Sequence, residues 1–384
     1  MCEDKIMHIT VFPAAQIHTM DPGRPHASAV AVANGRIVST GTIESMQPWL
    51  RRNTYEIDNR YADKIILPGF IDPHTHLRYS GVYMGLNYVG PIDSASPTGL
   101  RKGLPTRDAV CNQLRSLVSE HDDSSKPLTA WGYDPAVQEG HLDRDMLDAI
   151  SDTIPLWVVA YAPHIIYVNS PMLELIGVDE DSIGHGLGRY PDGRLNGWFV
   201  ETEAIARATR PVADSVYADG SGSQAIERMG AVAQQAGLTT TADLGWGFSE
   251  SFEKEWADHR SAIDNDRFPL RILMIPFEAR LTRDFGDEAI NFLAGKRLEG
   301  DDRLTTHGIK YVNDGSYPSM TLVMNQPGYL DDDTAHTGEI PWENMVDRMR
   351  PFWKAGIQIH SHANGDRTVD MTLDTLAALQ LEHP

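Results

Sequence analysis

Two histidines separated by one residue, His74 and His76, follow an apolar run in the segment PGFIDPHTHL (residues 68–77). Side chains two residues apart point to the same face of a β-strand, and strand geometry places them roughly 6–7 Å apart along the chain. Imidazole nitrogens bind zinc and similar divalent metals. Asp72 shares this face and could orient a ligand by hydrogen bonding without binding the metal itself. The pair predicts either part of a metal site or a solvated strand end.

A lysine stands in the middle of another expected strand, within HGIKYVNDGS (residues 307–316). An ammonium group is unfavourable to bury without compensation. Lys310 therefore faces solvent, pairs with an acid, or serves the metal site as a modified ligand or charge partner. The residues alone leave these alternatives open.

A second histidine pair, His360 and His362, shares one strand face in QIHSHANGDR (residues 358–367). Gly365 permits a sharp turn there, and Asp366 can cap the helix that follows. Parallel barrels carry catalytic groups at such strand ends. Each histidine could equally be a capping or solvated loop residue.

Other histidines carry weaker signals. His164 follows an apolar strand, where a satisfied polar residue is the simpler expectation, and we expect His141 and His185 at the surface. The sequence contains no Walker loop, no Gly-x-Ser-x-Gly elbow and no paired-cysteine zinc motif.

The elements that would position these residues fall into two regions. Residues 5–66 predict β-structure, with Asn34-Gly35 as the turn of a hairpin. After this region, apolar strands alternate with helices such as Gln224–Ala236 and one that begins near Asp366, which predicts parallel βα units. We expect these strands at Ile65–Ile71, Leu238–Leu244, Leu270–Ile275, Gly308–Val312 and Gly356–His360.

The segment from about residue 80 to 236 is too long for one crossover connection. We expect it to form an inserted subdomain, with a helix around Asp108–Val118 and a strand at Leu156–Ala160.

The amino-acid composition limits the kinds of partner that the protein can bind. The 384 residues carry 33 Lys and Arg against 54 Asp and Glu, a formal net charge of −21. This acidic balance argues against nucleic acid and against anionic membrane surfaces. Two cysteines make no disulfide framework, no secretory signal is visible, and no apolar stretch is long enough to span a bilayer. We expect a cytoplasmic protein, with a homodimer as the default assembly.

Three stretches together resemble the metal-dependent amidohydrolase superfamily: PGFIDPHTH, GLTTTADLG (237–245) and HSHANGDRTVD (360–370). The closest likeness is to the amidohydrolase 3 branch, which includes N-substituted formamide deformylases. AWGYDP (130–135), the region 147–173 and GRLNGWFVETEA (193–204) resemble the inserted region of that branch.

The resemblance implies an α/β fold, a TIM-like (β/α)8 barrel with a flanking β-sandwich. Residues 1–66 would form the N-terminal part of the sandwich, and residues 67–384 the first five barrel strands with the insert. It also implies a divalent metal centre of one or two ions, with zinc as the expected metal.

The resemblance further assigns roles to single residues. The metal ligands would be His74, His76, Lys310 and His362, with Lys310 carboxylated and bridging two ions. Catalysis would involve Lys310, His362 and His164. The residues expected to contact substrate are His164, Glu201, Asp314 and His360.

The implied activity is hydrolysis of a C–N bond in a linear amide or formamide, a small-molecule substrate, by metal-activated water. A deaminase, a cyclic amide or ester hydrolase, and a degenerate metal-free binding protein are the alternatives. A sixth-strand histidine and an eighth-strand aspartate, which the resemblance also implies, have no counterpart before Pro384. We therefore expect the sequence to be part of a longer chain.

Overall fold

The computed structural model describes residues 8–213, 222–316, 322–329 and 344–384. Contacts divide the chain into two compact units, Met1–Phe70 and Ile71–Pro384.

The first unit is a five-stranded sheet of order β3-β2-β1-β4, with β5 also paired to β1. The predicted hairpin is confirmed: β2 and β3 are antiparallel, and Asn34 and Gly35 between them both have positive φ. Met46 and Leu50 of the amphipathic helix α1 pack on the buried face of the sheet. The elements are β1 (His8–His18), β2 (His26–Ala33), β3 (Arg36–Gly41), α1 (Ile43–Leu50), β4 (Thr54–Ile57), η1 (Asn59–Tyr61) and β5 (Ile65–Ile66).

The second unit carries the strands that bear the candidate ligands. One sheet has the order β17-β16-β15-β6, and β18 and β19 form a separate parallel pair. Phe277, directly after β16, makes a parallel bridge to Lys310 of β18. The strands are β6 (Phe70–Thr75), β15 (Leu238–Trp246), β16 (Arg271–Pro276), β17 (Leu304–Thr306), β18 (Ile309–Val312) and β19 (Ile359–His362).

The five predicted strands therefore follow one another in chain order, which is consistent with the first part of a (β/α) barrel. The described strands form open sheets of four and two strands, so a closed barrel remains a proposal.

Two predicted strand boundaries are wrong for local reasons. The expected strand Ile65–Ile71 is interrupted between β5 and β6, where Pro68 lacks a backbone donor and Gly69 weakens strand structure. The fifth strand lies at Ile359–His362 rather than Gly356–His360, because Gly356 has a φ of +68° just after α12.

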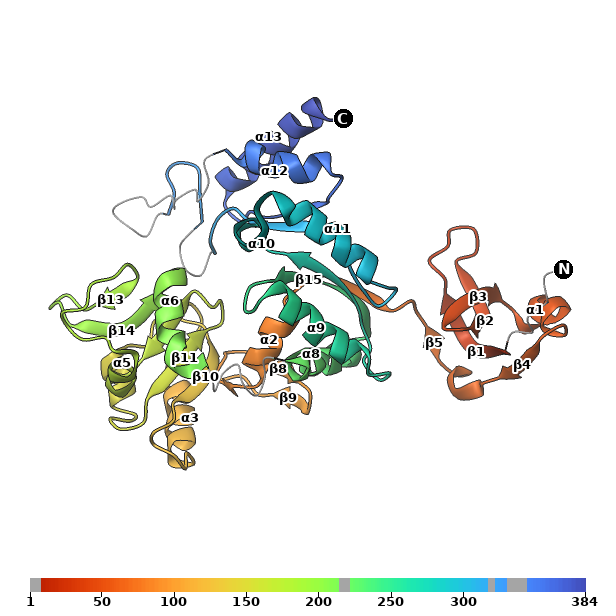
Figure 1. Cartoon of the computed structure of the whole chain (residues 1–384). Helices are drawn as coiled ribbons and strands as arrows, with labels where there is room; N and C mark the ends of the chain where they lie inside the picture. The colour runs from red at the N-terminus through yellow and green to blue at the C-terminus, as the bar shows by residue number, and fades with distance from the viewer. Residues whose placement is uncertain (1–7, 214–221, 317–321, 330–343) are drawn as a thin grey trace. The chain divides into compact units, whose positions relative to one another are not determined.

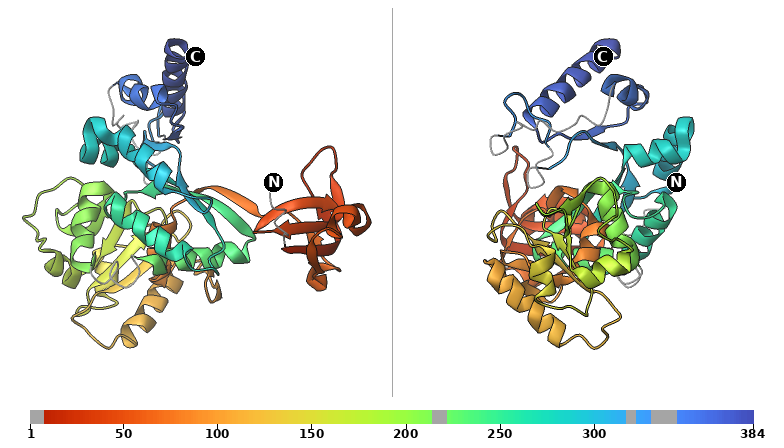
Figure 2. Two further views of the ribbon diagram at one scale, coloured as in Figure 1. Left: turned by 45° about the vertical axis from the view of Figure 1, so that its right-hand side comes forward. Right: turned by 90° about the vertical axis from the view of Figure 1, so that its left-hand side faces the viewer.

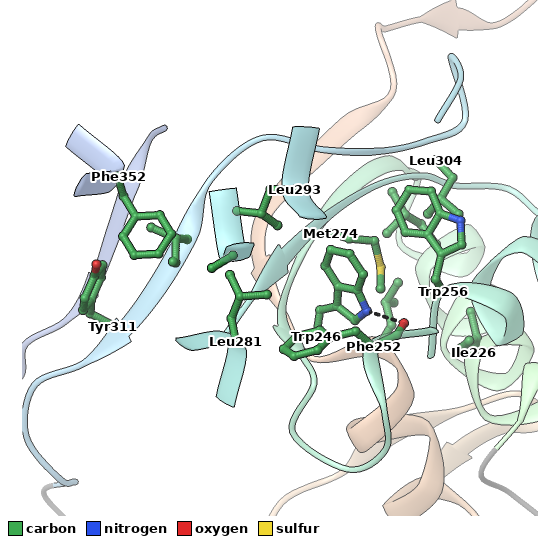
Figure 3. Close-up of a cluster of buried hydrophobic side chains, with 14 of the residues drawn as sticks. Ile226, Trp246, Phe252, Trp256, Met274, Leu281, Leu293, Leu304, Tyr311 and Phe352 are labelled. Carbon is green, nitrogen blue, oxygen red and sulfur yellow. Dashed lines mark hydrogen bonds between the residues drawn. The ribbon is translucent and has the colours of Figure 1, made fainter. Parts of the chain in front are cut away.

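Helices of the second unit bury a large apolar cluster (Figure 3). Trp246 at the end of β15 donates its indole N–H to the carbonyl of Phe252, 2.9 Å away. Tyr311 of β18 lies beside Phe352 in the same cluster. The helices are α2 (Leu77–Met84), α8 (Ser223–Gln235), α9 (Phe252–Ile263), α10 (Glu278–Phe285), η3 (Gly286–Glu288), α11 (Ala289–Glu299), α12 (Met345–Lys354) and α13 (Asp366–Glu382).

The region between β6 and α8 contains a mixed sheet of order β13-β14-β12-β11-β10-β7 (Figures 1 and 2). Alternate residues of β11 pack into two apolar clusters, so both faces of the sheet are covered. The predicted strand Leu156–Ala160 is confirmed as β11, and the predicted helix as α3 (Arg107–Ser119).

The remaining elements of this region are β7 (Asn87–Tyr88), β8 (Ser94–Ser96), β9 (Gly99–Arg101), β10 (Leu128–Tyr133), α4 (Arg144–Asp148), β12 (Ile165–Val168), α5 (Ser170–Ile176), β13 (Leu187–Arg189), β14 (Leu195–Val200), α6 (Glu201–Thr209) and η2 (Arg210–Val212).

His185 is exposed, as predicted, but the surface prediction for His141 is wrong. The His141 ring is half-buried, with Nδ1 2.8 Å from the Tyr167 hydroxyl, and its centroid lies 4.5 Å from that of Trp198. In the described parts of the chain, no helix has the length and apolar character needed to cross a membrane.

Candidate metal centre

His74 and His76 lie at the junction of β6 and α2. His74 is in the strand, and His76 is the residue before the helix, with φ −133° and ψ 76°. Their rings meet edge to face, with centroids 5.4 Å apart. The Asp72 carboxylate accepts the backbone N–H of His74 at 3.1 Å. Asp72 therefore fixes the backbone at the first histidine of the pair.

The His76 ring is adapted to metal binding. Its Nδ1 is buried and has no hydrogen-bond partner in the described structure. Burial lowers the pKa of His76 to about 4, so the ring is neutral near pH 7, the form that binds metals. A Cβ atom at Gly245 would lie 2.8 Å from this nitrogen, so a glycine is needed beside the ring.

Lys310 and His360 occupy paired positions on β18 and β19, and His362 pairs with Val312 two residues further along. Strand alternation therefore places all three polar side chains on one face of the pair. Lys310 is only 3% exposed, which excludes the solvent-facing alternative. Burial lowers the pKa of its amine to about 8, and no acid pairs with it among the described residues.

His360 resembles His76 in its surroundings. Its Nε2 is buried without a hydrogen-bond partner in the described part of the chain. A Cβ atom at Gly308 would lie 2.9 Å from that nitrogen. Burial, followed by the positive charges of Lys310 and His74, lowers the pKa of His360.

The four predicted ligands act on one another electrostatically. Burial is the largest cause of the lowered pKa of His74, and the positive charges of Lys310 and His362 add to it. The same two charges also lower the pKa of His76. These charge interactions act between residues of β6 and of the β18–β19 pair, more than 230 positions apart in sequence. Among the described residues, no group of three His, Cys, Asp or Glu side chains lies close enough together to hold a metal ion.

His362 is held by the loop that leaves β18. Its Nε2 lies 2.8 Å from the carbonyl oxygen of Gly315 and 2.8 Å from the side-chain amide nitrogen of Asn364. These contacts hold the ring through Nε2, which leaves Nδ1 as the nitrogen that would bind a metal.

Asp314 fixes the same loop. Its side chain is 0% exposed, and it accepts backbone N–H groups of Asn364 at 3.0 Å and Gly365 at 2.7 Å. The predicted cap by Asp366 is wrong: the N-cap of α13 is Gly365, and Asp366 accepts the backbone N–H of Asn325 at 2.8 Å.

The other predicted substrate contacts lie on the insert. His164, in the turn between β11 and β12, lines a small pocket together with Tyr133 and Tyr161. Glu201 is the first residue of α6; its side chain is outside the described part of the structure. The role of these residues, like that of the metal ligands, stays a prediction.

Asp243 and His259 were not predicted from the sequence. Asp243 lies on β15 and is 3% exposed, and His259 lies on α9 and is 1% exposed, with 3.2 Å between Oδ2 and Nε2. The signal was an aspartate inside the apolar strand GLTTTADLG, but its partner is 16 residues away on a helix.

The donor set fits a divalent ion. Among the predicted ligands, His76 has a buried Nδ1 without a partner in the described structure, and His362 has its Nε2 against the carbonyl oxygen of Gly315. Neutral imidazoles of this kind suit zinc and related metals. Fold and site together define an α/β protein with a candidate divalent-metal centre at the ends of parallel strands.

A sequence model of the amidohydrolase family matches residues 62–384, and the chain belongs to this family. Crystal structures of uncharacterized metal-dependent hydrolases from Pyrococcus horikoshii OT3 and Pyrococcus furiosus share its fold. The Pyrococcus horikoshii structure is 17% identical, with a TM-score of 0.66, and the match covers 96% of this chain and 68% of that one. The Pyrococcus furiosus structure is also 17% identical, with a TM-score of 0.65, and the match covers 97% of this chain and 70% of that one.

Curated relatives are distant. Protein LONG AFTER FAR-RED 3 of Arabidopsis thaliana is 26% identical over 93% of this chain, which spans 59% of that protein's length. Exoenzymes regulatory protein AepA of Pectobacterium carotovorum is 24% identical over 98% of this chain and 78% of its own. N-substituted formamide deformylase of Arthrobacter pascens is 24% identical over 95% of this chain and 65% of its own.

Proposed function

We propose that this chain carries the metal site of a hydrolase that cleaves a C–N bond in a linear amide or formamide. The observation that carries the proposal is the buried Nδ1 of His76, which has no hydrogen-bond partner in the described structure, together with the buried Lys310, which has no acidic partner there. Family membership and the formamide deformylase relative support the choice of reaction. The substrate would be a small molecule.

His74, His76 and His362 would hold the first ion, and Lys310 would contribute to a second. A bound zinc ion supplies water with a lowered pKa and polarises a substrate carbonyl. His360, beside Lys310, would face the substrate, as would His164 and Glu201 of the insert. Asp314 would contribute by holding the loop beside His362.

Lys310 has the properties of a lysine that reacts with carbon dioxide. A pKa of about 8 leaves a sizeable fraction of its amine neutral at physiological pH, and the neutral amine is the nucleophile. Addition of carbon dioxide to Nζ, with loss of one proton, gives a carbamate anion. That anion would place a negative ligand among histidines and remove the unfavourable buried ammonium.

Metal analysis of the purified chain tests the proposal. We expect at least one zinc ion per chain after dialysis against zinc, together with hydrolysis of formamides and linear amides in a substrate panel. The panel should include lactams, esters and aminated heterocycles, which distinguish the cyclic-amide, esterase and deaminase alternatives. A chain that retains no stoichiometric metal would support a metal-free binding protein instead.

A further inference from the structure

The Asp243 carboxylate holds the polypeptide on both sides of the His76 ring. Its Oδ2 accepts the backbone N–H of Leu77 at 3.1 Å, directly after His76. Its Oδ1 accepts the backbone N–H of Gly245 at 2.9 Å, and Gly245 is the residue whose missing Cβ makes room for the His76 ring. One carboxylate thus fixes both the backbone that carries the His76 ring and the backbone at Gly245, against which the ring lies.

The same contact caps a helix. Leu77 is the first residue of α2, and His76 at the N-cap gives the helix no side-chain hydrogen bond. A negative charge at a helix N-terminus is favourable, so Asp243 of β15 replaces the absent cap. The junction between β6 and α2, where His76 stands, is thereby tied to β15.

His259 completes the arrangement. Its Nδ1 lies 2.7 Å from the carbonyl oxygen of Glu255, and its Nε2 lies 3.2 Å from Asp243 Oδ2. Both ring nitrogens of His259 are therefore in hydrogen-bond contact, one with its own helix and the other with Asp243. Burial alone would raise the pKa of Asp243, but the hydrogen bond and charge of His259 lower it.

The helix that carries His259 is fixed at its first turn. The Glu255 carboxylate accepts the backbone N–H groups of Gly247 at 2.7 Å and Glu250 at 2.7 Å. Arg78, 3% exposed, adds a positive charge 3.9 Å from Glu255 and 3.5 Å from Asp258. These contacts hold α9 in place, so the position of His259 is defined as closely as that of Asp243.

We propose that Asp243 and His259 are positioning residues for His76, a buried hydrogen-bonded pair that fixes the orientation of its ring for metal binding. This inference rests on the proposed role of His76 as a ligand. Neither residue need touch metal or substrate. Their effect is on the affinity of the site, because a ligand that is already oriented loses less freedom on binding.

Zinc affinity of the purified full chain tests the inference, measured by competition with a chromophoric chelator alongside thermal unfolding without metal. Asp243→Ala should weaken zinc binding by about 10- to 100-fold, the usual range for groups that support a ligand. Asp243→Asn keeps one acceptor oxygen and should lose less, and His259→Gln should lose affinity while Asp243 remains. If Asp243→Ala does not fold, Asp243→Asn and His259→Gln test the inference instead. A loss of zinc affinity of about threefold or more in each variant would support it.

Asp148→Asn is the matched control. Asp148 accepts the backbone N–H of Ser170, the first residue of α5, at 2.7 Å, the same contact that Asp243 makes to α2. This variant should lower stability and leave zinc affinity unchanged. Equal zinc affinity in the wild type and in the folded Asp243 and His259 variants would overturn the positioning role alone. A wild-type chain that binds no zinc would overturn the proposed metal centre and this inference with it.

Discussion

Lys310 of β18 is paired in register with His360 of β19, and both side chains face the same side of that strand pair. The amine of Lys310 therefore lies among imidazoles, and no acid among the described residues compensates its charge. A buried ammonium in such surroundings is unfavourable. This unfavourable buried charge would be removed or compensated if the lysine is modified or if a ligand enters the site.

Removing either histidine at the β6–α2 junction should remove bound metal. We expect His74→Ala and His76→Ala to lower zinc affinity by at least about 100-fold, because each removes a direct ligand. Inductively coupled plasma mass spectrometry of dialysed protein measures the bound zinc. His185→Ala changes an exposed histidine and should bind zinc as the wild type does. Full zinc content in His74→Ala or His76→Ala would exclude that residue as a ligand.

Replacing Lys310 should separate stability from metal binding. Lys310→Met removes a buried ammonium but keeps much of the side-chain volume, so the metal-free chain should gain about 1–3 kcal/mol in free energy of unfolding at pH 7. The gain should shrink at higher pH, because the wild-type amine loses its proton near its folded pKa of about 8. Urea denaturation in a chelator measures both effects. The same variant should bind fewer zinc ions, and its binding should not depend on added bicarbonate.

The presence of the strands and the facing of the site residues could be predicted from the sequence, because both depend on local periodicity. Alternation correctly places His360 and His362 on one face, and the Asn34-Gly35 turn follows from backbone preferences. Boundaries were less predictable. The break at Pro68 and the start of β19 after Gly356 depend on single residues that an apolar pattern does not reveal.

Contacts between distant elements could not be predicted. The pairing of Asp243 with His259 depends on how α9 packs against β15. The half-buried state of His141 depends on Tyr167 and Trp198 from two other strands. Polar residues in a sequence resemble surface residues until the fold supplies their partners.

The loop beside His362 should depend on Asp314. Asp314→Asn weakens the charge-assisted hydrogen bonds to Asn364 and Gly365 and should reduce the free energy of unfolding by about 1–3 kcal/mol. Zinc affinity should also fall, because His362 loses its fixed loop. Asp301→Asn is the control: Asp301 accepts the backbone N–H of Arg303 at 2.8 Å in an exposed turn. It should affect stability alone, and an unchanged zinc affinity in Asp314→Asn would argue against this role.

Acid should destabilise the metal-free chain partly through His141. Burial lowers the pKa of His141 below the ordinary value of 6.5, so the folded ring stays neutral while the unfolded ring takes up a proton. The unfolded state then binds more protons below pH 6.5, and stability falls as the pH falls. His141→Gln, which can still contact the Tyr167 hydroxyl, should lose less stability between pH 7.5 and 5.5. Chelator-treated protein in urea at both pH values measures this, and equal losses in both proteins would contradict the prediction.

The two glycines beside the histidine rings should be sensitive to one added methyl group. A Cβ atom at Gly245 would lie 2.8 Å from His76 Nδ1, and one at Gly308 would lie 2.9 Å from His360 Nε2. Gly245→Ala must therefore displace the His76 ring, and zinc affinity should fall by about tenfold or more. Gly308→Ala should displace His360 and impair turnover more than zinc affinity, because the proposed role of His360 is to contact the substrate.

Gly295→Ala provides the comparison for both variants. Gly295 lies within α11, and a Cβ atom there would meet no heavy atom within 4 Å apart from its chain neighbours and the backbone of its own helix. Alanine in a helix interior is favoured over glycine by about 0.5–1 kcal/mol, so this variant should be slightly more stable and bind zinc normally. If Gly245→Ala retained wild-type zinc affinity, the His76 ring would have room to move without loss of binding, and it would not be the closely held ligand that the contacts around Asp243 imply.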